Sequence, residues 1–331
     1  MPDLRTVPPL PNITRMTIPV TNAGAMVGLL LTPTILIVGV LVYAARQVRG
    51  STLTAPLVWA GLSVTTVCGV ELAALAAGEG AARNWLPAVR FIAAVSSLCP
   101  AIALLGAKRP QSRAWQFILL TLIGILSQPA IVSLLMHYGE PVTLHAARRW
   151  FLAVLMLIGV ANYLPTRFAL SGVLVCAAQT LLLWGYLPGT EITTDAATAA
   201  TRVWFALLCT SAACALATAK WPRARRGATP WDQLWIDFRN AYGIVWSLRV
   251  EERLNASLAA AGENTRLGWN GFEIPPHQEQ EAVNDQPPEA TTSSGVATIT
   301  NAKDLAALPA LVALLRRFVS KEWIAKRIDG A

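Results

Sequence analysis

Long runs of apolar residues, separated by short polar segments, make up the first two thirds of the chain. A hydrocarbon layer about 30 Å thick is crossed by roughly 20 apolar residues in a helix. Seven runs reach or approach that length, and we expect each to form a membrane-spanning helix. They cover residues 24–44, 54–77, 85–105, 114–136, 150–165, 168–186 and 201–219. The pattern predicts an all-α, polytopic membrane domain over residues 23–219.

The fifth run is the shortest, and it ends in Leu164-Pro165-Thr166-Arg167, which predicts a tight turn into the sixth run. If these two runs form a single re-entrant unit, the number of spans falls to six. We expect seven.

Composition agrees with this division of the chain. Of the 331 residues, 54% are hydrophobic and 14% are charged, against about 25% charged in an ordinary soluble domain. Residues 23–219 hold only 16 of the 46 charged residues, whereas residues 220–331 hold 27. A membrane domain is therefore followed by a polar C-terminal extension.

Lysine and arginine in the short connections predict the orientation, because cytoplasmic loops are enriched in them. Ten lie on the side that includes the C-terminal extension, and six lie on the other side. We expect the chain to lie in a plasma or inner membrane, with residues 1–22 outside and the C-terminus in the cytoplasm. We expect no cleavable signal peptide. Since these cations account for much of the net charge of +8, the charge does not indicate a nucleic-acid partner.

Two ionisable residues fall within predicted spans, where a charge is costly. Glu71 and Arg90 lie at similar distances from the turn between the second and third spans, so an antiparallel hairpin brings them to the same depth. One interpretation is an ion pair that locks the hairpin, or an arginine that extends outward to the lipid headgroups. The alternative is a substrate or proton-coupling site.

Other polar residues of the spans are the amides Gln128, Asn162 and Gln179, which either join helices or line a transport path. All five cysteines lie in predicted spans, where we expect structural roles and no disulfides. In an outer loop, His137, Glu140 and His145 form only a weak metal-binding pattern. The sequence predicts no cofactor.

The C-terminal extension begins with a long helix predicted over 231–260, with large apolar side chains along one stripe. This stripe packs on the same chain, on a partner protein or on the membrane surface. Residues 265–274 contain Asn270-Gly271 and predict a hairpin. Residues 220–274 thus form a juxtamembrane segment, 275–300 a disordered linker and 301–331 amphipathic helices, the last of which Ser320 would cap.

The terminal helices either dock on a partner or fold back on the long helix. The candidate partner-docking residues are Trp231, Trp235, Phe238, Tyr242, Trp246, Leu315, Phe318 and Trp323.

Three functional hypotheses follow. The first is a non-enzymatic scaffold or an assembly or regulatory subunit, embedded in the lipid bilayer, whose cytoplasmic extension binds a protein partner. The second is a permease for a small solute or protons that uses Glu71, Arg90, Gln128 and Asn162. The third and weakest is a membrane enzyme with a metal site in the outer loop.

Overall fold

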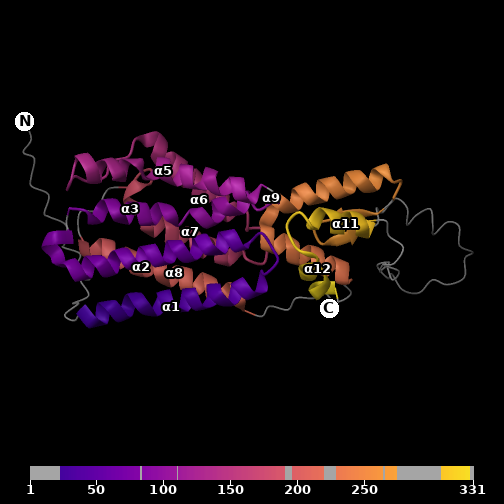
Figure 1. Cartoon of the computed structure of the whole chain (residues 1–331), viewed down its shortest axis with the longest axis horizontal. Helices are drawn as coiled ribbons and strands as arrows, with labels where there is room; N and C mark the ends of the chain where they lie inside the picture. Colours follow the sequence, from indigo (N-terminus) through magenta and orange to yellow (C-terminus); the bar gives the residue numbers. More distant parts are fainter. Residues whose placement is uncertain are drawn as a thin grey trace, which may run out of the picture.

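The computed structural model describes residues 23–82, 84–109, 111–190, 196–219, 229–263, 265–273 and 307–328. It is an elongated, mostly helical molecule in two parts (Figure 1). A bundle of long helices occupies one end, and a smaller C-terminal domain caps the other. Residues 1–22 and the predicted linker 275–300 lie outside the described residues.

The bundle contains the helices that the apolar runs predict. They are α1 (Ala23–Gln47), α2 (Thr54–Ala82), α3 (Leu86–Ser96), α4 (Cys99–Leu105), α5 (Ser112–Met136), α6 (Ala146–Ala161), α7 (Ala169–Leu182), the 3₁₀ turn η1 (Trp184–Tyr186) and α8 (Ala196–Thr218). Helix α7 packs most extensively on α8, and α1 packs on both α2 and α8. Many side chains of α1, α2 and α5 face outward and are large and apolar, as expected for helices that contact lipid.

The third predicted span is broken into α3 and α4 at Ser97 and Leu98. Pro100 stands in the first turn of α4 and has no backbone N–H, so the helix cannot continue through this point without losing a hydrogen bond. The break exposes the carbonyl of Ser97 to a neighbouring helix.

Five stretches of the described residues are long and apolar enough to cross a membrane, which indicates a membrane protein. They are Met26–Gln47, Thr54–Ala77, Leu86–Leu105, Ala114–Met136 and Thr198–Thr218. The expected count of seven is not confirmed. The fifth and sixth runs form α6 with 16 residues and α7 with 14, which extend only about 24 and 21 Å at 1.5 Å per residue.

The C-terminal domain is built around α9 (Pro230–Ala260). Thr229 caps this helix: its hydroxyl accepts a hydrogen bond from the backbone N–H of Asp232, whose carboxylate accepts one from the N–H of Thr229. The predicted hairpin is present as β1 (Arg266–Gly268) and β2 (Gly271–Glu273), with Leu267 opposite Phe272.

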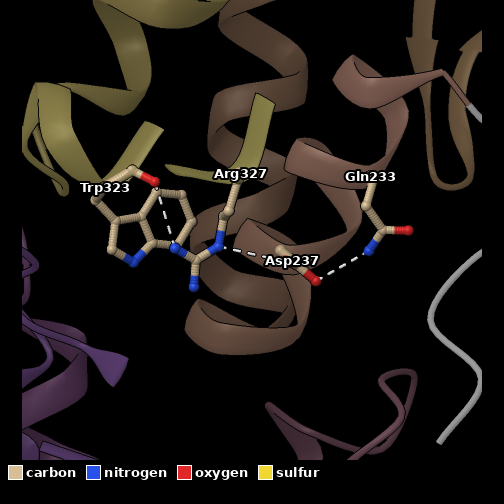
Figure 2. A network of polar contacts seen from close by, with 4 residues as sticks. All are labelled: Gln233, Asp237, Trp323 and Arg327. Atoms are coloured by element: carbon tan, nitrogen blue, oxygen red, sulfur yellow. Dashed lines mark hydrogen bonds and ion pairs between the residues drawn. The ribbon is translucent and has the colours of Figure 1, made fainter. Parts of the chain in front are cut away.

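Two short helices, α11 (Ala307–Leu315) and α12 (Lys321–Ile328), fold back onto α9. Ser320 caps α12 as predicted, since its hydroxyl accepts from the backbone N–H of Trp323. In Figure 2, Arg327 of α12 reaches Asp237 of α9, with 3.2 Å between Nε and Oδ2. The same guanidinium lies over the ring of Trp323, and Gln233 donates to the second oxygen of Asp237.

The fold-back places the predicted docking residues in the core of the domain. Trp235, Phe238 and Tyr242 are fully buried. Phe318 packs edge-on against Phe238, Tyr242 and Trp246 with ring centroids 5.0–5.3 Å apart. Of the eight candidates, Trp231 is half-buried and the other seven are buried.

Among the alternatives that the sequence left open for this stripe, the described residues show packing within the same chain. Helices α11 and α12 of the same chain cover its apolar side chains. This packing is favourable because it removes the apolar surface of the stripe from water.

Candidate functional site

A partly enclosed cavity of about 400 Å³ lies inside the bundle. Its walls come from α1, α2, α4, α6, α7 and α8, and its floor includes Asn240 and Ala241 of α9. Side chains from each wall include Ile37, Val64, Leu104, Val160, Val175, Leu207 and Ala217. The volume falls within the range of roughly 300–1,000 Å³ that is usual for small-molecule sites.

Two polar side chains of the wall, Gln179 and Thr210, are engaged within the protein. The Gln179 amide nitrogen donates to the Ser97 carbonyl at 2.9 Å, where the break between α3 and α4 leaves that carbonyl without its helical partner. The Thr210 hydroxyl donates to the carbonyl one turn earlier in α8. No charged side chain is among the lining residues. The cavity therefore favours an apolar occupant.

The floor of the cavity adjoins a sharp kink in α9. Gly243 has φ 75° and ψ −175°, which lies outside the helical region and is accessible mainly to glycine. The kink leaves backbone groups of α9 without helical partners. Asn162, at the end of α6, binds three of them: its carbonyl accepts from Ile244 N–H at 2.9 Å, its Oδ1 accepts from Val245 N–H at 3.1 Å, and its Nδ2 donates to the Tyr242 carbonyl at 3.4 Å.

Two further hydrogen bonds join the connection between α6 and α7 to the same part of α9. The Tyr163 hydroxyl donates to the Ala241 carbonyl, and the backbone N–H of Arg167 donates to Oδ1 of Asn240, each at 3.4 Å. Since Tyr163, Asn240 and Ala241 also line the cavity, its floor is part of the junction between bundle and domain.

The connection between α1 and α2 supplies a second contact with the domain. Ser51 and Val319 form an antiparallel bridge, flanked by hydrogen bonds from Thr52 N–H to the Phe318 carbonyl and from Ser320 N–H to the Gly50 carbonyl. The Tyr242 hydroxyl donates to the Phe318 carbonyl and lies 3.1 Å from the Thr52 hydroxyl. Burial raises the pKa of Tyr242 to about 12, so this phenol remains a hydrogen-bond donor at neutral pH.

The predicted pairing of Glu71 with Arg90 is confirmed. Arg90 donates from Nε to Oε1 and from a terminal nitrogen to Oε2, at 2.6 and 2.5 Å. Glu71 is buried at 4% exposed, whereas Arg90 is half-buried. Neither residue lines the cavity. This two-pronged ion pair joins α2 to α3, and the role of substrate or proton-coupling site remains a hypothesis.

The three amides predicted as intramembrane candidates do not come together. Gln179 lies in the cavity wall, and Asn162 lies at the end of the bundle beside α9. Gln128 is exposed on α5, where its Oε1 accepts from Arg148 at 2.7 Å. Gln128 and Asn162 thus have different partners, and the transport hypothesis stays a prediction.

The histidines predicted as weak metal ligands lie around the connection between α5 and α6. His145 caps α6 by accepting from the backbone N–H of Ala147. No three His, Cys, Asp or Glu side chains of the described residues are grouped as metal ligands, and the five cysteines are free thiols.

Sequence reasoning missed the kink at Gly243 and the partner that Asn162 finds there. A glycine within an otherwise helical segment is a signal for such a break, and Gly243 stands in the middle of the predicted helix. No family model matches the chain, and no curated protein or solved structure shows significant similarity to it.

Proposed function

We propose that this chain is a membrane protein that binds an apolar molecule within its helix bundle and uses its C-terminal domain as a regulatory unit. The bound molecule comes from the bilayer, such as a lipid acyl chain or another hydrocarbon-rich compound. The observation that carries the proposal is the mostly apolar cavity, which has no charged side chain in its lining and a floor of α9 residues.

Contact with the floor supports the regulatory part of the proposal. Asn240 and Ala241 line the cavity, and the next residue, Tyr242, is fully buried in the core of the C-terminal domain. A ligand that favours one position of this segment favours the matching arrangement of the domain. The assembly or regulatory role expected from the sequence then belongs to the domain's outer surface, where a protein partner would bind.

Orientation follows from the cations at the junction. Arg49, Arg109 and Arg167 belong to the three connections that adjoin the C-terminal domain. Enrichment of cations on this side favours a cytoplasmic domain and an N-terminus outside, in a plasma or inner membrane.

Two alanines of α8 provide a matched test. Ala217 lines the cavity and Ala215 does not, and both are exposed enough to accept a larger side chain. The purified full chain in detergent would be titrated with a fatty acid that carries an environment-sensitive fluorophore. We expect saturable binding that Ala217→Trp weakens by about tenfold, the equivalent of about 1.4 kcal/mol of lost contacts, and that Ala215→Trp leaves unchanged.

Equal binding by the two variants would place the probe on the outer surface and would overturn the proposal. If Ala217→Trp does weaken binding, lipid extracted from the same preparations would be identified by mass spectrometry. The lipid whose amount Ala217→Trp reduces is the natural occupant. Hydrogen exchange of residues 230–260 with and without the probe would test the regulatory part separately.

A further inference from the structure

Four cationic side chains from three segments converge where the C-terminal domain meets the bundle. Lys108 lies in the connection between α4 and α5, and Arg317 is the second residue after the end of α11. Arg249 and Arg253 lie one turn apart on α9 and are exposed. We refer to Lys108, Arg249, Arg253 and Arg317 as the basic cluster.

Hydrogen bonds between the three segments hold the cluster in place. The backbone N–H of Arg109 donates to the carbonyl of Arg317 at 2.8 Å. The indole N–H of Trp246 donates to the carbonyl of Leu104 at 2.9 Å, and the guanidinium of Arg249 lies over the same indole, 5.1 Å from its centroid. These contacts tie the connection after α4 to both α9 and the segment after α11.

Positive charge is in excess around the basic cluster. Glu252 neighbours Arg253 on α9, and Arg316 adds a further exposed cation next to Arg317. None of the four cluster residues forms an ion pair with a described carboxylate. Desolvation and repulsion by Arg253, Arg317 and Arg249 lower the pKa of Lys108.

Topology alone does not account for this arrangement. The positive-inside bias places cations in loops next to a membrane. Arg249 and Arg253 instead belong to a helix of the C-terminal domain, which Trp246 holds against the end of α4. Like charges at close range repel one another. A multiply charged anion removes that repulsion, and phosphate accepts several hydrogen bonds from guanidinium groups at once.

We propose that the basic cluster binds a phosphate-bearing anion, which is either the headgroup of an anionic phospholipid or a soluble phosphate compound. Lys108 follows α4 by only three residues, which places the cluster at the end of the bundle, where headgroups lie. The site is separate from the apolar cavity and does not depend on the function proposed for it.

The test uses the purified full chain in nanodiscs and two probes. In the lipid arm, each protein is placed in nanodiscs of mixed phosphatidylcholine and phosphatidylglycerol. Native mass spectrometry then measures which of the two lipids the protein retains after release. In the soluble arm, pyrophosphate is titrated into nanodiscs of phosphatidylcholine alone, and the midpoint of thermal unfolding is recorded. The variant is Arg249→Gln/Arg253→Gln, and its control is Lys321→Gln/Lys326→Gln, which removes the same charge from exposed positions of α12.

For a lipid headgroup, we expect the wild type and the control to retain phosphatidylglycerol preferentially, and the arginine variant to lose this preference by roughly tenfold or more, as removal of two cations near an anionic lipid implies. For a soluble phosphate, pyrophosphate raises the unfolding midpoint of the wild type and the control but not of the arginine variant.

The proposal is overturned if neither probe binds the wild type, or if the arginine variant and the control respond alike. Should the arginine variant not fold, Lys108→Gln at a half-buried position is compared with Lys321→Gln, so that each variant removes one charge. None of the substituted residues lines the cavity, and the lipid arm measures preference for the anionic headgroup over phosphatidylcholine. Failure of this proposal is therefore distinguishable from failure of the apolar-ligand proposal.

Discussion

Asn162 and Gly243 fit together as a clasp between the membrane bundle and the C-terminal domain. The side chain and carbonyl of Asn162 bind three backbone groups on either side of the glycine, 80 residues later in the chain. A Cβ atom on residue 243 would collide with this asparagine. The kink and the residue that stabilises it therefore depend on each other.

Replacing Gly243 by alanine should disrupt this clasp. The new Cβ requires both a strained left-handed φ and the displacement of Asn162, so we expect a loss of at least about 2–3 kcal/mol in the free energy of unfolding, given that strained backbone alone costs roughly 1–3 kcal/mol. Denaturant unfolding in detergent measures the loss. Gly262 is the control, because its φ of 73° is similar but nothing lies within 4 Å of an added Cβ. If Gly262→Ala costs as much as Gly243→Ala, the fit with Asn162 contributes nothing.

Removal of the Asn162 side chain tests the other half of the clasp. Asn162→Ala leaves the Val245 N–H and the Tyr242 carbonyl without their partner, and buried groups without hydrogen bonds cost about 1–3 kcal/mol each. We expect lower stability and faster hydrogen exchange at residues 242–245. The exposed amide of Gln128 serves as a comparison, since Gln128→Ala removes a hydrogen bond to Arg148 at the surface. Unchanged exchange in α9 would contradict the role assigned to Asn162.

The ion pair between Glu71 and Arg90 should behave as a structural unit. Glu71→Gln leaves the guanidinium of Arg90 without its counter-charge, and breaking a buried pair on one side costs about 3–5 kcal/mol. We expect a clear fall in the thermal unfolding midpoint, with much of it recovered in Glu71→Gln/Arg90→Gln. A single variant that stays fully stable while a solute flux disappears would favour the transport hypothesis instead.

Stability should also depend on pH through Glu251. Burial raises the pKa of this carboxyl, the nearby Arg266 partly opposes the rise, and one of its oxygens is buried without a hydrogen-bond partner among the described residues. Because the folded state holds the proton more tightly than the unfolded state, stability falls as pH rises from the ordinary glutamate pKa through the raised one.

Glu251→Gln should therefore stabilise the protein at neutral pH, and the gain should disappear at a pH below the ordinary glutamate range. Unfolding midpoints across this pH range measure it. Glu252→Gln makes the same change at an exposed neighbour and should show no comparable gain. A gain that persists in acid would rule out the carboxylate as its source.

Several features of this fold are encoded locally and follow from the pattern of residues. Apolar runs predicted the helices of the bundle, Asn270-Gly271 predicted the hairpin, and Ser320 predicted the start of the last helix. The match in depth between Glu71 and Arg90 also followed from their similar distances from the turn that connects α2 and α3. Each of these depends on the length, period or end chemistry of a single segment or of two neighbours.

The candidate sites depend on segments that are distant in sequence. Periodicity identifies the apolar stripe on α9, but not whether α11 and α12 or another protein covers it. The cavity requires six helices to leave space between them, and the basic cluster requires three segments to meet. None of these distances is encoded in a local pattern.

Hydrophobicity and period act within each segment, so the residue pattern alone predicts a mostly α-helical chain with apolar helices long enough for a membrane and a polar helical extension. Three further features emerge from packing between distant segments: the extension buries its own stripe, Asn162 stabilises the kink at Gly243, and an apolar cavity and a basic cluster flank the junction. The physical reason is that side-chain packing and long-range hydrogen bonds select among many arrangements of the same amphipathic helices.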